Sequence, residues 1–249
     1  MEKENITKKL YIFLVILLAA AAAVSVQNGT LKRGQRRFDS YINDIGRSPD
    51  SPPYLSLHYR IRKAYFAVEP HEKNPIVFLG DSMTDEGDWT KLFPDKNVVN
   101  RGIGGDTTLG VLNRINQIIA LKPPKIFLMI GTNDLCYNRS ISDTVNNYDK
   151  ILFLLHRNLP GTKVYVESVL PFNDDIFPSV YLRTNADIKL LNTYIRKLAN
   201  KYNYPYLDIT APFTGNDGKL PSDETIDGLH LNKKGYNIWR EQIQNYVYE

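Results

Sequence analysis

The chain has 249 residues, 43% of them hydrophobic and 23% charged, which is typical of one larger globular domain with appendages. Lys and Arg number 31 against 27 Asp and Glu, so the formal net charge is only +4. We expect no nucleic-acid partner, because phosphate binding needs a concentrated basic face and these basic residues are spread out. Cys136 is the only cysteine, which excludes an intramolecular disulfide and a cysteine-rich zinc site.

The N-terminus carries a membrane-directing segment. Residues 1–9 form a basic n-region, and residues 10–26 (LYIFLVILLAAAAAVSV) are an uninterrupted apolar run of 17 residues. The small-x-small triplet Ala23–Ser25 suits signal cleavage, but an uncleaved anchor fits equally well. Basic residues flank the run on both sides, so the charge rule leaves its orientation open. We expect a membrane-anchored or secreted protein whose main domain is extracytoplasmic.

A tether and entry segment follows, from residue 27 to residue 74. It is polar and basic at first, and Ser48–Pro53 breaks any regular structure. The segment Tyr54–Val68 mixes aromatic with basic residues and is expected to form a short helix packed on the domain. The domain itself spans residues 75–249.

Short apolar runs rich in branched residues alternate with longer helical segments in this domain. The expected strands are Ile76–Leu79, Asn97–Asn100, Lys125–Ile130, Lys163–Val169 and Pro205–Asp208. The expected helices are Thr107–Leu121, Ile141–Leu159, Asp187–Tyr202 and Lys233–Tyr248. This alternation predicts an α/β fold, a three-layer αβα sandwich with about five parallel strands, preceded by the apolar N-terminal helix. The ligand site should lie beyond the carboxyl ends of the strands.

The exits of the first three strands share glycine followed by small polar groups. They read Gly80-Asp81-Ser82, then Arg101–Thr107 (RGIGGDT), then Gly131–Asp134 (GTND). Glycine lets a backbone N–H approach a ligand, and Ser and Asn supply reacting or donating atoms.

Serine acyl chemistry needs a hydroxyl, a base, an acid that orients the base, and donors for the oxyanion. Ser82 supplies the hydroxyl. His230 is the candidate base, because only this histidine lies in a late loop with an acid three residues away, Asp227. The available oxyanion donors are the backbone N–H groups of Ser82 and Gly105 and the side-chain amide of Asn133. Three carboxylates are expected to brace the surrounding loops by accepting backbone N–H bonds: Asp81, Asp106 and Asp134. Substrate contact is the alternative role for Asp81 and Asp106.

Four competing motifs fail. A dinucleotide fingerprint fails because Thr107 occupies the third glycine position, and an aspartyl phosphatase fails because Met83 replaces the second acid. The hydrolase elbow G-x-S-x-G fails because Thr84 stands at its last glycine. A calcium loop is excluded by the spacing of its candidate ligands Asp81, Asp85 and Asp88.

Four blocks, GDS, NRGIGGDTT, GTND and DGLH, resemble in order and content those of the SGNH or GDSL-type hydrolases. The resemblance covers about 70% of the chain, and the second block is most similar to the branch with the catalytic subunits of intracellular platelet-activating-factor acetylhydrolase. It implies a flavodoxin-like fold, a Ser82–His230–Asp227 triad, an oxyanion hole of Ser82, Gly105 and Asn133, and neither metal nor organic cofactor.

The expected function is hydrolysis of short acyl, chiefly acetyl, esters of carbohydrate or lipid. An acyltransferase on the same fold is the alternative, and a catalytically silent cell-surface binding module is a third reading that the intact catalytic set argues against. The aromatic segment Pro171–Thr184 either lines the substrate pocket or forms a surface loop. The sequence leaves the natural ester and the oligomeric state open.

Overall fold

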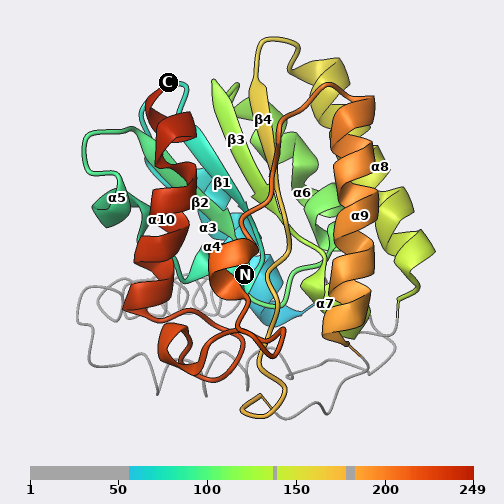
Figure 1. Cartoon of the computed structure of the whole chain (residues 1–249). Helices are drawn as coiled ribbons and strands as arrows, with labels where there is room; N and C mark the ends of the chain where they lie inside the picture. The colour runs from blue at the N-terminus through green and yellow to red at the C-terminus, as the bar shows by residue number, and fades with distance from the viewer. Residues whose placement is uncertain (1–55, 137–138, 178–182) are drawn as a thin grey trace, which may run out of the picture. The chain divides into compact units, whose positions relative to one another are not determined.

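The computed structural model describes residues 56–136, 139–177 and 183–249 (Figure 1). The predicted basic n-region, the apolar run 10–26 and the tether up to residue 55 lie outside the described residues. Within those described ranges, no helix is both long and apolar enough to span a membrane.

The described part of the chain contains one parallel sheet of five strands, in the order β2-β1-β3-β4-β5. The strands are β1 (Ile76–Gly80), β2 (Val98–Gly102), β3 (Lys125–Met129), β4 (Lys163–Glu167) and β5 (Tyr206–Leu207). The predicted α/β class with a parallel, about five-stranded sheet is thereby confirmed. Since β1 pairs with β2 on one side and β3 on the other, the exits of these three strands lie next to each other.

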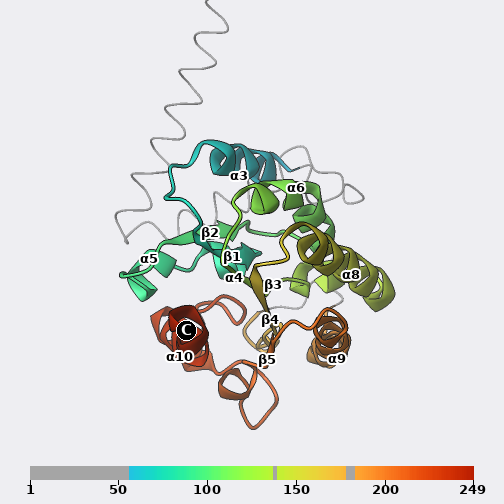
Figure 2. The ribbon, with the colours of Figure 1, turned by 90° about the horizontal axis from the view of Figure 1, so that it is seen from above.

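Helices cover both faces of the sheet (Figure 2). One face carries α6 (Thr108–Ala120), α8 (Ile141–Asn158) and α9 (Asn185–Lys201), and the other carries α5 (Trp89–Leu92) and α10 (Lys233–Tyr248). The four long helices begin at side chains that accept a backbone N–H bond from the first turn. These N-caps are Thr107, Ser140, Thr184 and Asn232.

Alternate residues of the buried strands enter two separate cores, because successive side chains of a strand point to opposite faces. Val77 and Leu79 join the core beneath α6, α8 and α9. Phe78, between them, enters the core beneath α10, where its ring stacks on Trp89 at 3.9 Å and on Phe127 at 5.1 Å between centroids.

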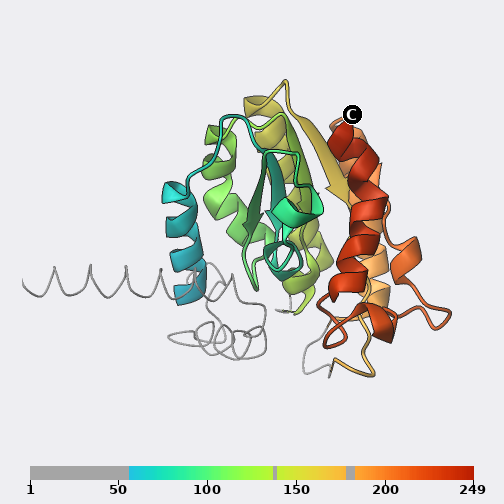
Figure 3. The same cartoon turned by 90° about the vertical axis from the view of Figure 1, so that its left-hand side faces the viewer.

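The helix expected in Tyr54–Val68 is present as α3 (Leu57–Val68), which packs on α6 outside the main core (Figure 3). The buried Tyr59 hydroxyl donates a 2.6 Å hydrogen bond to the carbonyl of Gly110 in α6. Tyr59, Phe66 and Ile103 form a small apolar cluster of their own. This cluster fixes α3 beside the exit of β2.

The strand exits differ from expectation in one respect. Short helices begin there, α4 (Ser82–Asp85) after β1 and α7 (Thr132–Cys136) after β3, and neither is among the helices expected from the sequence. A helix of four or five residues is too short to show a helical hydrophobic period, so the pattern could not predict it. Two 3₁₀ turns, Ala211–Phe213 and Ser222–Glu224, precede α10.

Candidate active site

Ser82 is the first residue of α4 and follows the interior strand β1 with one residue, Asp81, between them. The Asp81 side chain caps this helix, accepting a 3.0 Å bond from the backbone N–H of Met83. Gly80 is required before the turn, because a Cβ there would lie 2.2 Å from Thr84 Oγ1 and 2.4 Å from the carbonyl oxygen of Met129. Burial raises the pKa of Asp81 to about 7. The predicted bracing role of Asp81 is thus seen as a helix cap.

The segment Asp227–His230 forms a compact turn before α10. Asp227 Oδ1 accepts hydrogen bonds from the backbone N–H groups of Leu229, at 3.0 Å, and His230, at 2.8 Å. Gly228 has φ of +92°, a conformation that residues with a Cβ rarely adopt. A Cβ at this position would also lie 2.7 Å from the carbonyl oxygen of Asn173.

The structure brings Ser82, His230 and Asp227 into one hydrogen-bonded chain. His230 Nε2 lies 3.0 Å from Ser82 Oγ, and His230 Nδ1 lies 2.8 Å from Asp227 Oδ2. With the proton on Nδ1 held by the carboxylate, Nε2 is left as the acceptor that faces the hydroxyl. This is the geometry that serine activation by a base requires.

The electrostatics of the pair favour a charged carboxylate beside a basic imidazole. Burial alone would raise the pKa of Asp227, but the hydrogen bonds and charge of His230 outweigh it and lower the pKa to about 2. Burial likewise opposes the charged form of His230, yet the bond to Asp227 and the nearby charges of Glu86, Asp227 and Asp81 raise its pKa above the ordinary 6.5.

The other candidate donors lie on the two neighbouring strand exits. Gly105, between β2 and α6, has φ of +74°, which suits glycine and turns its backbone out of the strand direction. Asn133, in the first turn of α7, is 9% exposed, and its Nδ2 donates a 2.9 Å bond to the carbonyl oxygen of Asp106. The amide group has two N–H bonds, and this contact uses one of them.

Two buried carboxylates brace these exits, as the sequence predicted. Asp106 Oδ1 accepts the N–H of Thr107, and its Oδ2 pairs with Arg114 at 2.9 Å. Asp134 accepts both the backbone N–H and the hydroxyl of Thr108, at 2.9 Å and 2.5 Å, so it ties the exit of β3 to the start of α6.

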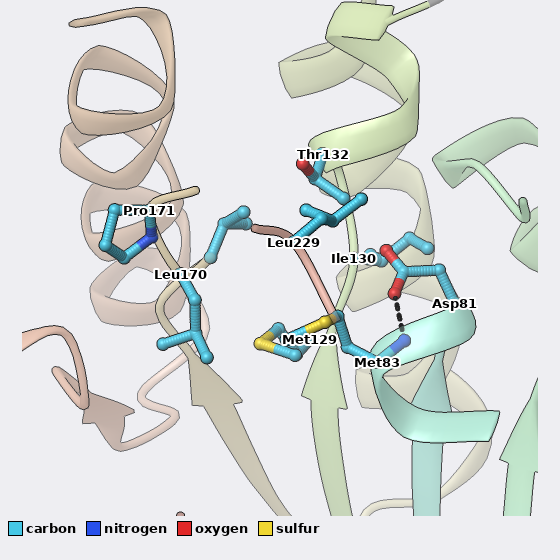
Figure 4. Close-up of a pocket in the computed structure, with 9 residues that line it drawn as sticks. Asp81, Met83, Met129, Ile130, Thr132, Leu170, Pro171 and Leu229 are labelled. Atoms are coloured by element: carbon cyan, nitrogen blue, oxygen red, sulfur yellow. Dashed lines mark hydrogen bonds between the residues drawn. The ribbon is translucent and has the colours of Figure 1, made fainter. Parts of the chain in front are cut away.

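A pocket opens between the exits of β1, β3 and β4 (Figure 4). Its wall is mostly apolar and consists of Asp81, Met83, Met129, Ile130, Thr132, Val169, Leu170, Pro171 and Leu229. Three of these residues, Met83, Thr132 and Leu229, are next in sequence to Ser82, Asn133 and His230. Pro171 brings the start of the aromatic segment to this wall, and residues 178–182 of that segment lie outside the described residues.

Sequence reasoning missed three polar contacts around the site. Glu86 Oε1 lies 3.9 Å from His230 Nε2, Arg62 pairs with Asp85, and Arg183 Nη1 donates a 2.9 Å bond to Thr132 Oγ1. Only Glu86 had a signal in the sequence, because it stands four residues after Ser82 and would share a helix face with it. Arg62 and Arg183 come from distant segments, which no local pattern reveals.

Comparison with known proteins adds three findings. The model of the GDSL-like lipase/acylhydrolase family matches residues 78–238. Platelet-activating factor acetylhydrolase IB subunit alpha2 of Rattus norvegicus is 31% identical over 191 residues, which cover 74% of this chain and 78% of the relative. A GDSL-like lipase from Bacteroides thetaiotaomicron superposes with a TM-score of 0.65 at 26% identity, covering 75% of this chain and 97% of that protein.

Proposed function

The chain belongs to the GDSL-like lipase/acylhydrolase family and is an ester hydrolase, and from this premise we propose that it removes short acyl groups, chiefly acetyl, through an acyl-enzyme on Ser82. The observation that carries the proposal is the chain of contacts from Ser82 Oγ through the His230 ring to Asp227, at 3.0 Å and 2.8 Å. Neither a metal nor an organic cofactor is needed for this chemistry.

In the acylation step, Ser82 Oγ attacks the ester carbonyl carbon while His230 Nε2 takes the hydroxyl proton. The Asp227 carboxylate keeps the proton on Nδ1 and stabilises the imidazolium that forms. Negative charge then develops on the carbonyl oxygen, where the N–H groups of Ser82 and Gly105 and the second N–H of Asn133 are the available donors. Collapse of the tetrahedral intermediate passes the proton from Nε2 to the leaving alcohol.

Deacylation repeats these steps with water. His230 Nε2, neutral again, takes a proton from a water molecule that attacks the acyl carbon on Ser82. The same donors bind the second oxyanion, and the intermediate releases the acid and restores the Ser82 hydroxyl. A sugar hydroxyl in place of this water would make the enzyme an acyltransferase, and the tests below distinguish the two.

The pocket beside Ser82 supports a short, apolar acyl group. Met83, Thr132 and Leu229, which line it, are next in sequence to the three site residues Ser82, Asn133 and His230, and on this support we place the acyl group of the acyl-enzyme in this pocket. The rat relative is by name an acetylhydrolase of platelet-activating factor, which supports acetyl as the group removed. The leaving alcohol is a carbohydrate or a lipid.

The direct test is a panel of p-nitrophenyl esters with acetyl, butyryl and octanoyl groups. We expect kcat/KM for the acetate to exceed that for the octanoate at least about tenfold, because each added methylene must enter an apolar pocket of fixed shape. An acetylated xylo-oligosaccharide and an acetylated lysophospholipid then identify the leaving group. Preference for the octanoate, or acyl transfer to sugar without release of free acid, would contradict the proposal.

For the N-terminus, we propose that residues 10–26 bring the enzyme to a membrane and that its catalytic domain works outside the cytoplasm. The support is the apolar run that follows the basic n-region. Mass measurement of the mature chain separates the two forms, because loss of about 25 residues means a cleaved signal and an intact start means an anchor. A full-length chain found free in the cytoplasm would contradict both.

A further inference from the structure

The loop Gly102–Asp106, which we call the oxyanion loop, is anchored on both sides of its central glycines by buried side chains, Ile103 in the cluster with Tyr59 and Phe66 and Asp106 in its pair with Arg114. Between these anchors lie Gly104 and Gly105, which have no side chains that packing could hold. The N–H of Asp106 closes a turn on the carbonyl of Ile103 at 3.0 Å. From outside the loop, Asp85 Oδ2 accepts a 3.1 Å bond from the N–H of Gly104, within the glycine pair itself.

Asp85 links this loop to the candidate nucleophile. It ends α4, the helix that Ser82 begins, and its own N–H donates a 2.8 Å bond to the carbonyl of Asp81. The backbones of the oxyanion loop and α4 pass very close to each other here, since a Cβ on Gly102 would lie 2.1 Å from the backbone nitrogen of Asp85. A shift of the Asp85 carboxylate therefore changes where Gly104 sits relative to Ser82.

The second oxygen of Asp85 is held by helix α3. Arg62 Nη2 lies 2.5 Å from Asp85 Oδ1 and 3.3 Å from the carbonyl oxygen of Gly102, so one nitrogen contacts both α4 and the oxyanion loop. The guanidinium is itself fixed by the buried Phe66 ring, whose centroid lies 4.8 Å away. The side chains of Arg62 and Asp85 are 26% and 19% exposed, so water screens their attraction only in part.

His58, one turn before Arg62, bounds the same place. His58 Nε2 lies 3.9 Å from Asp85 Oδ2, and a Cβ on Gly104 would lie 3.4 Å from the same His58 nitrogen. The face of α3 that carries His58 and Arg62 thus closes over the carboxylate that holds Gly104.

We propose that Arg62 and Asp85 are positioning residues for the oxyanion hole, which fix the Gly104–Gly105 backbone so that the N–H of Gly105 points at the developing charge. Neither residue touches the substrate, and both act through the bond from Gly104. The inference rests on the proposed function, in which Gly105 is an oxyanion donor. It assigns to α3, a helix that precedes the sheet, a part in catalysis.

The consequence is a specific kinetic loss. An N–H donor that moves by up to about 1 Å is still present, but it stabilises the transition state less. The expected cost is a fall in reaction rate on the order of 10- to 100-fold. The loss should fall on kcat, because the oxyanion forms only after the substrate has bound.

The experiment compares Arg62→Ala with Lys63→Ala, using p-nitrophenyl acetate. Lys63 is the matched control, since its Nζ bonds Asn113 of α6 at 2.7 Å and so helps dock α3 without contacting Asp85. We expect kcat to fall about 10- to 100-fold in Arg62→Ala with KM within about twofold, and to stay within about twofold in Lys63→Ala. Equal kcat in the two variants, or a change in KM alone, would overturn the proposal.

Two further variants separate positioning from loss of fold. Asp85→Asn keeps the size of the side chain, so it carries the test if Arg62→Ala does not fold, and the same fall in kcat is expected. The double variant Arg62→Ala with Asp85→Asn should have a kcat no lower than that of the slower single variant, because both changes break the same linkage from α3 to Gly104. Losses that multiply in the double variant would contradict the linkage.

Ser82→Ala serves as the reference that separates this inference from the proposed function. If Ser82→Ala stays active, the proposed function fails. An inactive Ser82→Ala beside a fully active Arg62→Ala rejects only this inference.

Discussion

His230 Nε2 lies 3.0 Å from Ser82 Oγ, although 148 residues separate the two along the chain. Ser82 is placed by the cap on α4, and His230 by the turn that Asp227 and Gly228 form before α10. Each is thus held by its own local structure, and the packing of α10 on the sheet sets the distance between them. The predictions that follow test whether this contact and its surroundings do the chemistry proposed.

The side-chain amide of Asn133 should be essential for turnover. In Asn133→Ala, kcat for p-nitrophenyl acetate is expected to fall about 100- to 1000-fold, the usual effect of removing one oxyanion donor. Asn158→Ala is the matched control, because that exposed amide bonds the carbonyl of Leu154 in its own helix, away from the site. The oxyanion role is wrong if Asn133→Ala stays within about threefold of the parent.

Because Asn133 also bonds the carbonyl of Asp106, its loss can loosen the oxyanion loop as well. A thermal melt accompanies the kinetics for this reason. A variant that melts near the parent temperature but turns over slowly places the effect in catalysis.

Activity should fall as the pH drops through the pKa of His230. The base must be neutral to accept the Ser82 proton, and its pKa is raised above 6.5, so the acidic limb of kcat/KM should have its midpoint above pH 6.5. Glu86→Gln removes a carboxylate 3.9 Å from Nε2, which should lower that pKa and move the limb to lower pH.

Asp88→Asn is the control for this shift, since Asp88 is an exposed carboxylate that pairs with Lys91. It should leave the pH profile in place. A limb that does not move in Glu86→Gln, or that moves to higher pH, contradicts the electrostatic account of His230.

Acyl-chain selection should depend on the wall of the pocket next to Ser82. Shortening Met83 or Leu229 to Ala adds space there for the two extra methylenes of a butyryl group. The ratio of kcat/KM for p-nitrophenyl butyrate to kcat/KM for the acetate should therefore rise by about 10-fold. Leu190→Ala, on the exposed face of α9, should leave the ratio unchanged. If both pocket variants keep the parent ratio, the acyl group lies elsewhere.

The fold was largely predictable, because the spacing of apolar residues and the glycines that follow the strands can both be seen in short stretches of the sequence. The helix Lys233–Tyr248 has the predicted bounds, and β1 extends the predicted Ile76–Leu79 by one residue, Gly80. The strand predicted at Lys163–Val169 ends at Glu167. The Ser168 N–H still bonds the carbonyl of Leu207, but the Val169 N–H bonds the side chain of Asn192 instead of a strand. Apolar composition alone cannot show where the ladder stops.

The candidate site was predictable only in part. Ser82, Gly105, Asn133 and the Asp227–His230 turn each stand next to glycine or an acid that marks them in the sequence. The structure places the first three at adjoining strand exits and brings the turn before α10 to Ser82. Their catalytic roles stay predictions. The contact from Arg62 to Asp85 was not predictable, because it depends on how α3 packs on α6, a long-range arrangement without a local pattern.

The most direct test of the central claim is the activity of Ser82→Ala on p-nitrophenyl acetate. The hydroxyl contacts only the His230 ring among the described residues, so its removal should leave the melting temperature within a few degrees of the parent. The account predicts that kcat falls at least about 10⁴-fold in this folded variant. A folded Ser82→Ala enzyme that retains activity within about tenfold of the parent would contradict it.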